Sequence, residues 1–184
     1  ESIQALKFGA VDIMAKPHGS HSIGLSMLSK ELVAKVIAAA QVDVNKLAST
    51  GIISERPRNK VKPSAYVGPY APVVVIASST GGPRALRTLI PGLTTDAGVS
   101  YVVIQHLPEG FSGPLAQDLN NSTDLNVREA EEGDSLKPGD LIFAKAGFHC
   151  VFDKSGKVTL NKGATLWGVR PSADITMVSL VPVY

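Results

Sequence analysis

The fold can be inferred first from one segment, Val73-Val74-Val75-Ile76-Ala77-Ser78-Ser79-Thr80-Gly81-Gly82-Pro83. Its apolar, β-branched first half is typical of a buried strand in a parallel sheet. Two glycines then favour a tight turn, and Pro83 is compatible with the first turn of a helix, where its missing N–H leaves no bond unmade. We therefore predict a strand over residues 73–77 that leads directly into a helix over residues 83–90.

A second apolar run, residues 100–105, predicts a neighbouring strand that ends next to His106. In an open parallel sheet, ligands bind outside the carboxyl ends of the strands. Ser79 and His106 both follow such strand ends, so the topology can bring them together although they are far apart in the chain. A serine hydroxyl beside a histidine is the arrangement of a nucleophile and its general base.

The downstream chain alternates helix and strand and then becomes richer in β structure. A helix is expected over about residues 111–121 and a further strand over residues 141–144. Residues 148–152 and 157–160 read as a hairpin around an Asp-Lys-Ser-Gly turn. The sequence thus predicts an α/β fold, in which a doubly wound, mostly parallel sheet carries a β-hairpin insertion.

Two further regions precede this domain. Residues 8–17 predict a short buried strand that ends at a Lys-Pro step. A helical apolar stripe follows, and its members are Leu25, Leu28, Leu32, Val33, Val36, Ile37 and Ala40. After it, prolines and basic residues interrupt the periodic pattern, as is typical of a linker. The predicted organisation is a βα unit over residues 1–44, a linker over 45–71 and a larger domain over 72–184.

Composition limits the possible function classes. The 184-residue chain is 44% hydrophobic, which is enough for a sizeable core, and its formal charge of +2 gives no reason to expect binding to nucleic acid. Cys150 is the only cysteine, and no apolar run approaches the ~20 residues that span a bilayer. The predicted location is the cytoplasm. Because the chain begins at Glu1 without a methionine or a leader, we expect it to be a fragment.

Four ordered motifs carry a family resemblance. They are Ala77-Ser78-Ser79-Thr80-Gly81-Gly82-Pro83, Gln105-His106-Leu107-Pro108-Glu109-Gly110-Phe111, Glu129-Ala130-Glu131-Glu132-Gly133-Asp134 with Leu136-Lys137-Pro138-Gly139, and Gly168-Val169-Arg170-Pro171-Ser172-Ala173-Asp174. In this order they resemble the chemotaxis protein-glutamate methylesterase family (CheB) over about residues 72–184. Residues 9–12 with Lys16-Pro17 resemble the last strand of a response-regulator receiver domain, which precedes the esterase in that family.

The resemblance implies a role for each matching residue of the esterase. Ser79, immediately before Thr-Gly-Gly, stands at the nucleophile, and His106 stands at its base. Thr80, Gly81 and Gly82 are implied to line the oxyanion site, since N–H groups at a helix start can face a developing negative charge. A second set, Arg170 and Asp174, is implied to be substrate-binding or structural, with an ion pair between the two as the structural alternative.

The implied activity is hydrolysis of glutamyl methyl esters on chemotaxis receptors, which releases methanol, with a related deamidation of glutamine. The implied partners are these methyl-accepting receptors, which would hold the protein peripheral to the membrane, and a chemotaxis histidine kinase that phosphorylates the receiver. Lys16 matches the receiver lysine that contacts the phosphoryl group. The resemblance implies no metal or other cofactor for the esterase. It implies Mg²⁺ only for phosphorylation of a complete receiver domain. In this family the linker and the receiver restrain access to the active site until the receiver is phosphorylated.

Several features depart from the family pattern. The family's third triad member is an aspartate in a Gly-Met-Gly-x-Asp-Gly segment, which would lie beyond Tyr184, and the receiver's phosphate-accepting aspartate would lie upstream of Glu1. We therefore expect this span alone to be nearly inactive. Ser78 stands where the family usually has a small residue such as Ala, Lys145 stands where it commonly has proline, and Pro182 falls in an expected helix.

Each candidate also has a plainer interpretation. A Ser-Thr-Gly-Gly turn is often a helix cap or a phosphate-binding loop, and a histidine at a strand end is often a polar edge residue. His149 beside Cys150, and His18 near His21, lack the three or four spaced donors of a metal site and are expected on the surface or in the hairpin. The alternative function is therefore a non-catalytic doubly wound module that binds an anion at this turn.

Overall fold

The fold is known from a computed structural model, which describes residues 5–6, 8–14, 23–42 and 71–184. The chain divides into two compact units, residues 1–57 and 58–184. Most of the predicted linker, as well as Lys16, His18 and His21, lies outside the described residues. Among the helices that are described, none has the length and apolar character needed to cross a membrane.

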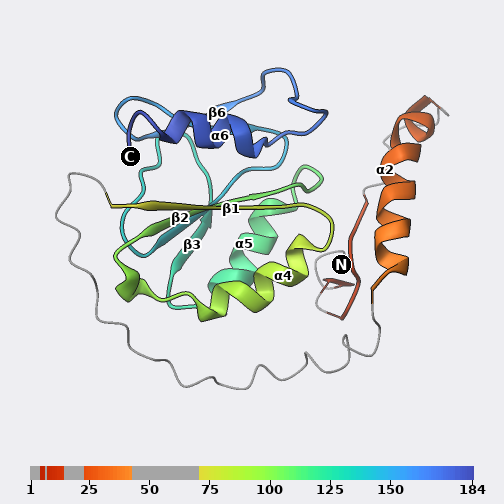
Figure 1. The fold of residues 1–184 in the computed structure, drawn as a ribbon, viewed down its shortest axis with the longest axis horizontal. Coiled ribbons are helices and arrows are strands. Elements are labelled where there is room, and N and C mark those ends of the chain that lie inside the picture. The colour runs from red at the N-terminus through yellow and green to blue at the C-terminus, as the bar shows by residue number, and fades with distance from the viewer. Residues whose placement is uncertain (1–4, 7, 15–22, 43–70) are drawn as a thin grey trace. The chain divides into compact units, whose positions relative to one another are not determined.

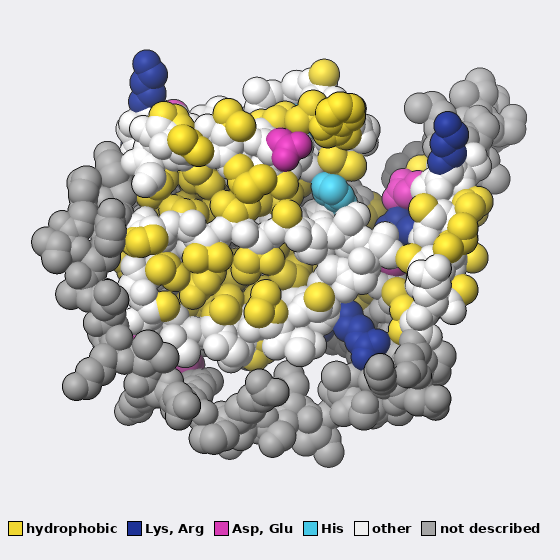
Figure 2. All heavy atoms as spheres, in the orientation of Figure 1, with side chains coloured by type: hydrophobic (Ala, Val, Ile, Leu, Met, Phe, Trp, Pro, Cys, Tyr) yellow, Lys and Arg dark blue, Asp and Glu magenta, His cyan; other side chains and the backbone are white. Residues whose placement is uncertain are grey.

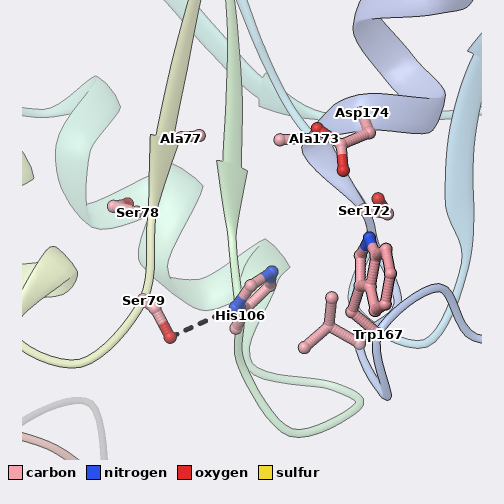
Figure 3. Close-up of a pocket in the computed structure, with 9 residues that line it drawn as sticks. Ala77, Ser78, Ser79, His106, Trp167, Ser172, Ala173 and Asp174 are labelled. Atoms are coloured by element: carbon pink, nitrogen blue, oxygen red, sulfur yellow. Dashed lines mark hydrogen bonds between the residues drawn. The ribbon is translucent and has the colours of Figure 1, made fainter.

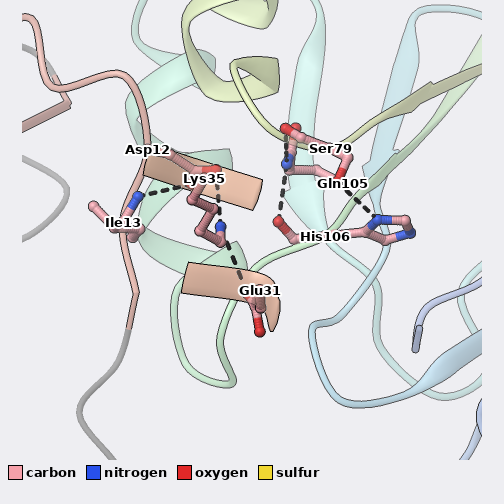
Figure 4. Close-up of polar contacts among 7 residues, drawn as sticks. All are labelled: Asp12, Ile13, Glu31, Lys35, Ser79, Gln105 and His106. Carbon is pink, nitrogen blue, oxygen red and sulfur yellow. Dashed lines mark hydrogen bonds and ion pairs between the residues drawn. The ribbon is translucent and has the colours of Figure 1, made fainter. Parts of the chain in front are cut away.

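The first unit contains the predicted helix, α2 (Ile23–Ala40). The strand predicted over residues 8–17 is not formed in its described part, residues 8–14. An extended segment becomes a strand only when a neighbour completes its ladder of backbone hydrogen bonds, and no described segment pairs with this one. Instead, Lys35 Nζ donates to the Asp12 carboxylate at 2.8 Å, which ties the segment to α2 (Figure 4).

The apolar stripe of α2 is not covered by the described residues. The side chains in its second half remain about half exposed, namely Leu32, Val33, Val36 and Ile37. The helix prediction was therefore correct, but the burial that the stripe suggested is not seen in the part of the chain that the structure describes.

The second unit is built on a four-stranded parallel sheet with the strand order β1-β2-β4-β3. Its strands are β1 (Val73–Ser78), β2 (Ser100–Gln105), β3 (Asn126–Glu129) and β4 (Asp140–Phe143). Three of them confirm predicted strands, but β1, which was expected to be buried, lies at the edge of the sheet and none of its six residues is buried. The fourth, β3, was not predicted, because its sequence is short and polar and only Val127 is buried.

Helices cover both sides of the sheet, as a doubly wound fold requires. They are α4 (Gly82–Leu89), α5 (Ser112–Asn120) and α6 (Ala173–Leu180). Figure 1 shows α4 and α5 on one side of the sheet, and α6 on the other together with the predicted hairpin. The hairpin pairs β5 (His149–Phe152) with β6 (Val158–Asn161) in antiparallel fashion. Short 3₁₀ turns, η2 (Ile90–Gly92) and η3 (Thr95–Ala97), lead from α4 to β2.

One part of the core lies between the sheet and the hairpin layer. All six residues of β2 are buried, and one cluster joins the sheet residues Val102, Ile104 and Ile142 to Cys150 and Phe152 of the hairpin. Burying one such apolar side chain contributes about 1.5–3 kcal/mol. The carboxyl end of β2 is therefore attached to the best-packed part of the molecule.

Two of the three departures from the family pattern in residues 72–184, Lys145 and Pro182, are accommodated by the fold. Lys145 forms an ion pair with Glu129 at 3.5 Å, and its ammonium group lies 6.0 Å from the centre of the Phe148 ring. Pro182 was expected inside a helix, but α6 ends at Leu180, so the proline lies just past the helix end. A proline there removes no helical hydrogen bond.

Candidate active site

The ends of β1 and β2 bring the predicted serine and histidine together. Ser78 lies opposite Gln105 in the strand register, so the residues that follow them, Ser79 and His106, are neighbours. The distance from Ser79 Oγ to His106 Nδ1 is 3.1 Å, and Figure 3 shows the other ring nitrogen pointing into the pocket. Ser79 is exposed and His106 is half-buried, so solvent and a ligand can reach both side chains.

A buried amide fixes the backbone on both sides of this pair. Gln105 is fully buried, and its Nε2 donates to the carbonyl oxygens of Ser79 at 2.8 Å and of His106 at 2.9 Å (Figure 4). Its Oε1 accepts a hydrogen bond from the Ser78 hydroxyl at 2.6 Å. One side chain therefore sets the separation of the two candidate catalytic residues, and Ser78 is engaged with it.

Each of the two glycines in the turn is required by a different structural constraint. Gly81 adopts a φ of +79°, a left-handed conformation that glycine takes without strain. Gly82 packs against Gln105 so closely that a Cβ atom would collide with its side-chain oxygen. The Gly82 N–H donates to the Ser79 carbonyl at 2.8 Å, so that amide, predicted to line the oxyanion site, is already engaged.

The Thr80 amide is in a different state. Among the described residues it has no hydrogen-bond acceptor, and it lies at the start of α4. The first N–H groups of a helix lack intrahelical partners and carry partial positive charge. The amide of Gly81, the N-cap residue of α4, likewise has no acceptor among the described residues, so Thr80 and Gly81, which directly precede α4, are the members of the predicted oxyanion set whose amides are available to a ligand.

An open pocket of about 370 Å³ lies beside the Ser79–His106 pair. Its lining residues are Ala77, Ser78, Ser79, His106, Trp167, Val169, Ser172, Ala173 and Asp174. Figure 3 shows two walls: the strand ends that carry Ser79 and His106, and a facing segment that carries Trp167 and Asp174. On the surface, a histidine is visible next to hydrophobic side chains and a carboxylate (Figure 2).

Arg170 and Asp174 do not form the ion pair that was the structural alternative. Arg170 Nη1 donates to the carbonyl oxygens of Lys162 at 2.9 Å and Gly163 at 2.7 Å, and no ion pair joins it to Asp174 in the described structure. Asp174 is exposed in the first turn of α6 and lines the pocket. The contacts of Arg170 are therefore structural, whereas Asp174 faces a potential ligand.

The His149–Cys150 pair is buried in the hairpin layer. His149 is only 2% exposed, its Nε2 lies 3.0 Å from the Ala164 carbonyl, and its Nδ1 accepts from the Ser172 amide at 3.2 Å. Burial, and then the charges of Asp134 and Glu132, raise the pKa of Cys150 to about 12. The hairpin placement was predicted correctly, but a surface position was not. Within the described residues, no three His, Cys, Asp or Glu side chains could hold a metal ion together.

Sequence reasoning missed two residues of this site. Gln105 was noted only as the neighbour of His106, although a polar residue that closes an otherwise apolar strand is a signal of a buried hydrogen-bonding role. Trp167 received no role, although Trp167-Gly168 forms the two central residues of a tight turn. An exposed tryptophan in such a turn is a further signal of binding.

One protein family and several curated proteins are similar to this chain. The family described as CheB methylesterase matches residues 74–184. Two curated relatives, from Symbiobacterium thermophilum and Thermotoga maritima, are named protein-glutamate methylesterase/protein-glutamine glutaminase; they are 39% identical over 192 residues and 38% identical over 186. Each alignment covers all of this chain but only 53% and 52% of the relative. The chain thus spans about half the length of the curated relatives it matches.

A solved structure is similar as well. It is described as the crystal structure of the Thermotoga maritima CheB methylesterase catalytic domain, with a TM-score of 0.59 and 40% sequence identity. The match covers 62% of this chain and 62% of that one. The four-stranded parallel sheet and the antiparallel hairpin described above therefore have a counterpart in a known catalytic domain.

Proposed function

Because this chain belongs to the CheB methylesterase family, we propose that it hydrolyses the γ-methyl esters of glutamyl side chains, with Ser79 as nucleophile and His106 as general base. One observation carries the proposal: Ser79 Oγ lies 3.1 Å from His106 Nδ1 beside an open pocket. This is within hydrogen-bond reach of a base that can take the hydroxyl proton.

The chemistry follows from which ring nitrogen faces the serine. When the neutral ring carries its proton on Nε2, Nδ1 of His106 accepts the Ser79 proton as Oγ attacks the ester carbonyl carbon. The carbonyl oxygen becomes negative and is stabilised by the Thr80 amide at the start of α4. When the intermediate collapses, the bond to the methoxy oxygen breaks, and methanol leaves with the proton from His106.

A water molecule completes the cycle. The same nitrogen of His106 takes a proton from water, which attacks the acyl-serine and releases the glutamyl carboxylate, and the proton returns to Ser79 Oγ. With a glutamine side chain in place of the ester, the same steps release ammonia instead of methanol. No step requires a metal or an organic cofactor.

We extend the proposal to the whole protein. The substrates are methylated glutamates of chemotaxis receptors, as the activity named for the relatives suggests. Residues 1–44 would belong to a receiver domain, in which Lys16 contacts a phosphoryl group that a chemotaxis histidine kinase supplies with Mg²⁺. Phosphorylation would then relieve a restraint on the esterase site in the cytoplasm. The Lys16-Pro17 step and the position of α2 after it support this assignment.

The alternative, a module that binds an anion at the Ser-Thr-Gly-Gly turn, has less support. The Gly82 amide is engaged by the Ser79 carbonyl, and the Asp174 carboxylate lines the adjacent pocket. A phosphate there would lose one of the expected backbone donors and would face a like charge.

Two readouts test the proposed nucleophile. The first is methanol release from a helical peptide that carries a glutamate γ-methyl ester, and the second is covalent labelling by a fluorophosphonate, located by peptide mass spectrometry. We expect the label on Ser79, and we expect Ser79→Ala to lose both signals. Ser122→Ala, which changes an exposed serine after α5, is the matched control and should keep both. Labelling of a different serine, or methanol release that survives Ser79→Ala, would show that the assignment is wrong.

A further inference from the structure

Trp167 occupies an unusual position for a large aromatic residue. Leu166 and Val169 pair through two backbone hydrogen bonds, so Trp167 and Gly168 form a two-residue hairpin turn. Both central residues have positive φ, +55° for Trp167 and +79° for Gly168. Asn-Gly is the favoured pair in such a turn, and a bulky residue at positive φ is strained. Turn preference therefore does not explain the tryptophan.

Packing does not explain it either. The Trp167 side chain is 85% exposed, although tryptophan is normally largely buried. Strained backbone in a native structure tends to mark functional positions, where the conformation is held for a purpose other than stability. The turn thus holds an apolar ring in solvent at a cost in free energy. A ligand that covers the ring would remove this apolar surface from water.

The indole lies where such a ligand would pass. Trp167 lines the pocket on the wall that faces Ser79 and His106, and Asp174 lies on the same wall (Figure 3). Among the described residues that line the pocket, Asp174 is the one acidic residue, and none is a lysine or arginine. This wall therefore combines an apolar aromatic surface with a negative charge.

We propose that Trp167 and Asp174 form a specificity wall that admits the uncharged methyl ester and disfavours the carboxylate formed from it. This inference rests on the proposed function. The indole packs against the methylene and methyl groups of the esterified glutamate, and these groups leave water on binding. Hydrolysis turns the same side chain into an anion at neutral pH, which the Asp174 carboxylate repels. The pocket thus distinguishes the uncharged ester from the anionic product, and release of the product is favoured.

The single tryptophan of the chain makes the contact directly measurable. The 184-residue chain with Ser79→Ala is titrated with an alanine-rich helical peptide that carries one glutamate γ-methyl ester, and with the same peptide carrying a free glutamate. We expect the ester peptide to shift the Trp167 emission to shorter wavelength and to bind about tenfold more tightly than the acid peptide. Peptide anisotropy, from a dye outside the helix, gives the affinities independently.

Substitutions in the same background separate the two parts of the wall. Trp167→Asn keeps the turn, since Asn-Gly adopts both positive φ angles readily, and it should weaken ester binding about tenfold. Asp174→Asn should strengthen binding of the acid peptide about fivefold and leave the ester peptide unchanged. The matched control is Val178→Ala, which changes an exposed apolar residue of α6 outside the pocket lining and should leave both affinities unchanged.

The outcomes that overturn the wall are distinct from those that overturn the esterase. Ester binding that is absent, that leaves the Trp167 emission unchanged, or that is equally tight in Trp167→Asn overturns the apolar contact. An acid peptide that binds Asp174→Asn no better than the parent overturns the charge effect. By contrast, an emission shift with the ester peptide, together with no methanol release from a full-length protein that contains this span and retains Ser79, contradicts the proposed hydrolysis and leaves the proposed specificity wall intact.

Discussion

The two walls of the pocket are built in opposite ways. The wall with Ser79 and His106 consists of strand ends, and the fully buried Gln105 fixes the backbone of both residues. The facing wall consists of a two-residue turn, from which Trp167 projects 85% exposed, and of the first turn of α6, which carries the exposed Asp174. Bond making needs atoms held within fractions of an ångström, whereas recognition of an apolar group does not. The difference fits the proposal that the first wall carries out the chemistry and the second wall recognises the substrate.

This contrast predicts different responses to mutation. The first wall is continuous with the packed strand β2, so removing its buried polar contacts should cost both stability and rate. The second wall makes few internal contacts, so changes there should alter affinity while the fold persists. The predictions below, ordered from the largest expected effect to the smallest, test how far the two walls are independent.

The largest effect is expected at the base itself. His106→Ala should lower the rate of methanol release by at least about 10⁴-fold, because the serine then lacks a proton acceptor. His106 is half-buried at a strand end, so circular dichroism and the melting temperature should change little. The matched control is His149→Ala, which removes a buried ring with two hydrogen-bond partners and should lower the melting temperature instead. A His106→Ala chain that unfolds would identify His106 as a structural residue.

The next largest effect is expected at Cys150 of β5, in the hairpin layer behind the second wall. Since burial, followed by Asp134 and Glu132, raises the pKa of Cys150 to about 12, almost no thiolate exists in the folded chain near neutral pH. Alkylation by iodoacetamide at about pH 8 should therefore be roughly 10³-fold slower in the native chain than in denaturant. Equal rates would show that β5 and its layer open often, and that the second wall has no fixed support.

The same pKa has a consequence for stability. The unfolded thiol loses its proton near pH 8.5, whereas the folded thiol keeps it up to about pH 12. The unfolded state then binds fewer protons, so this group's contribution to the free energy of unfolding is complete below about pH 8.5 and declines as the pH rises towards 12. Denaturant unfolding at several pH values should show this slope, and Cys150→Ala should reduce it.

The third prediction concerns Gln105, whose side-chain amide fixes the backbone of the first wall. Gln105→Ala leaves the Ser79 and His106 carbonyls without their donor and should lower the free energy of unfolding by about 3 kcal/mol. The freed backbone should also displace the catalytic pair and reduce kcat by about 10²-fold, with little change in KM. Gln117→Ala, at an exposed position of α5, is the control for the loss of a glutamine. An unchanged kcat in a folded Gln105→Ala chain would show that the pair is positioned without this amide.

Much of the fold was predictable because two of its strands, the edge strand β1 and the buried strand β2, are long apolar runs. Residues 73–78 and 100–105 give a clear signal since nearly every side chain is hydrophobic. β3 gave no signal because one buried valine is enough to hold a short edge strand beside β4. For residues 8–14 the error is the opposite one. Their apolar side chains predict a strand, but no strand forms because no described neighbour pairs with them.

The site was predictable as far as topology determines it. Ser79 and His106 follow adjacent parallel strands, and the rule on strand ends places them together without any knowledge of side-chain direction. The roles of Gln105 and Trp167 depend on where a side chain points and on a left-handed turn, and a single sequence does not encode either in its periodicity. The Arg170–Asp174 ion pair, the structural alternative for these two residues, is not formed for the same reason, because the Arg170 guanidinium donates to carbonyl oxygens instead.

The smallest effect is expected at Ser78. It lies next to the proposed nucleophile, but its hydroxyl is bonded to the buried Gln105 side chain. Its hydroxyl donates to Gln105 Oε1 at 2.6 Å, and Ser78→Ala removes this one bond while both donor bonds of the Gln105 amide remain. We expect a loss of about 1 kcal/mol in the free energy of unfolding and less than about a threefold loss in methanol release. Denaturant unfolding and the release assay measure the two quantities on the same preparation. If Ser78→Ala were as inactive as Ser79→Ala, the hydroxyl of Ser78 would take part in the reaction, and the first wall would hold two reacting serines rather than one nucleophile with its support.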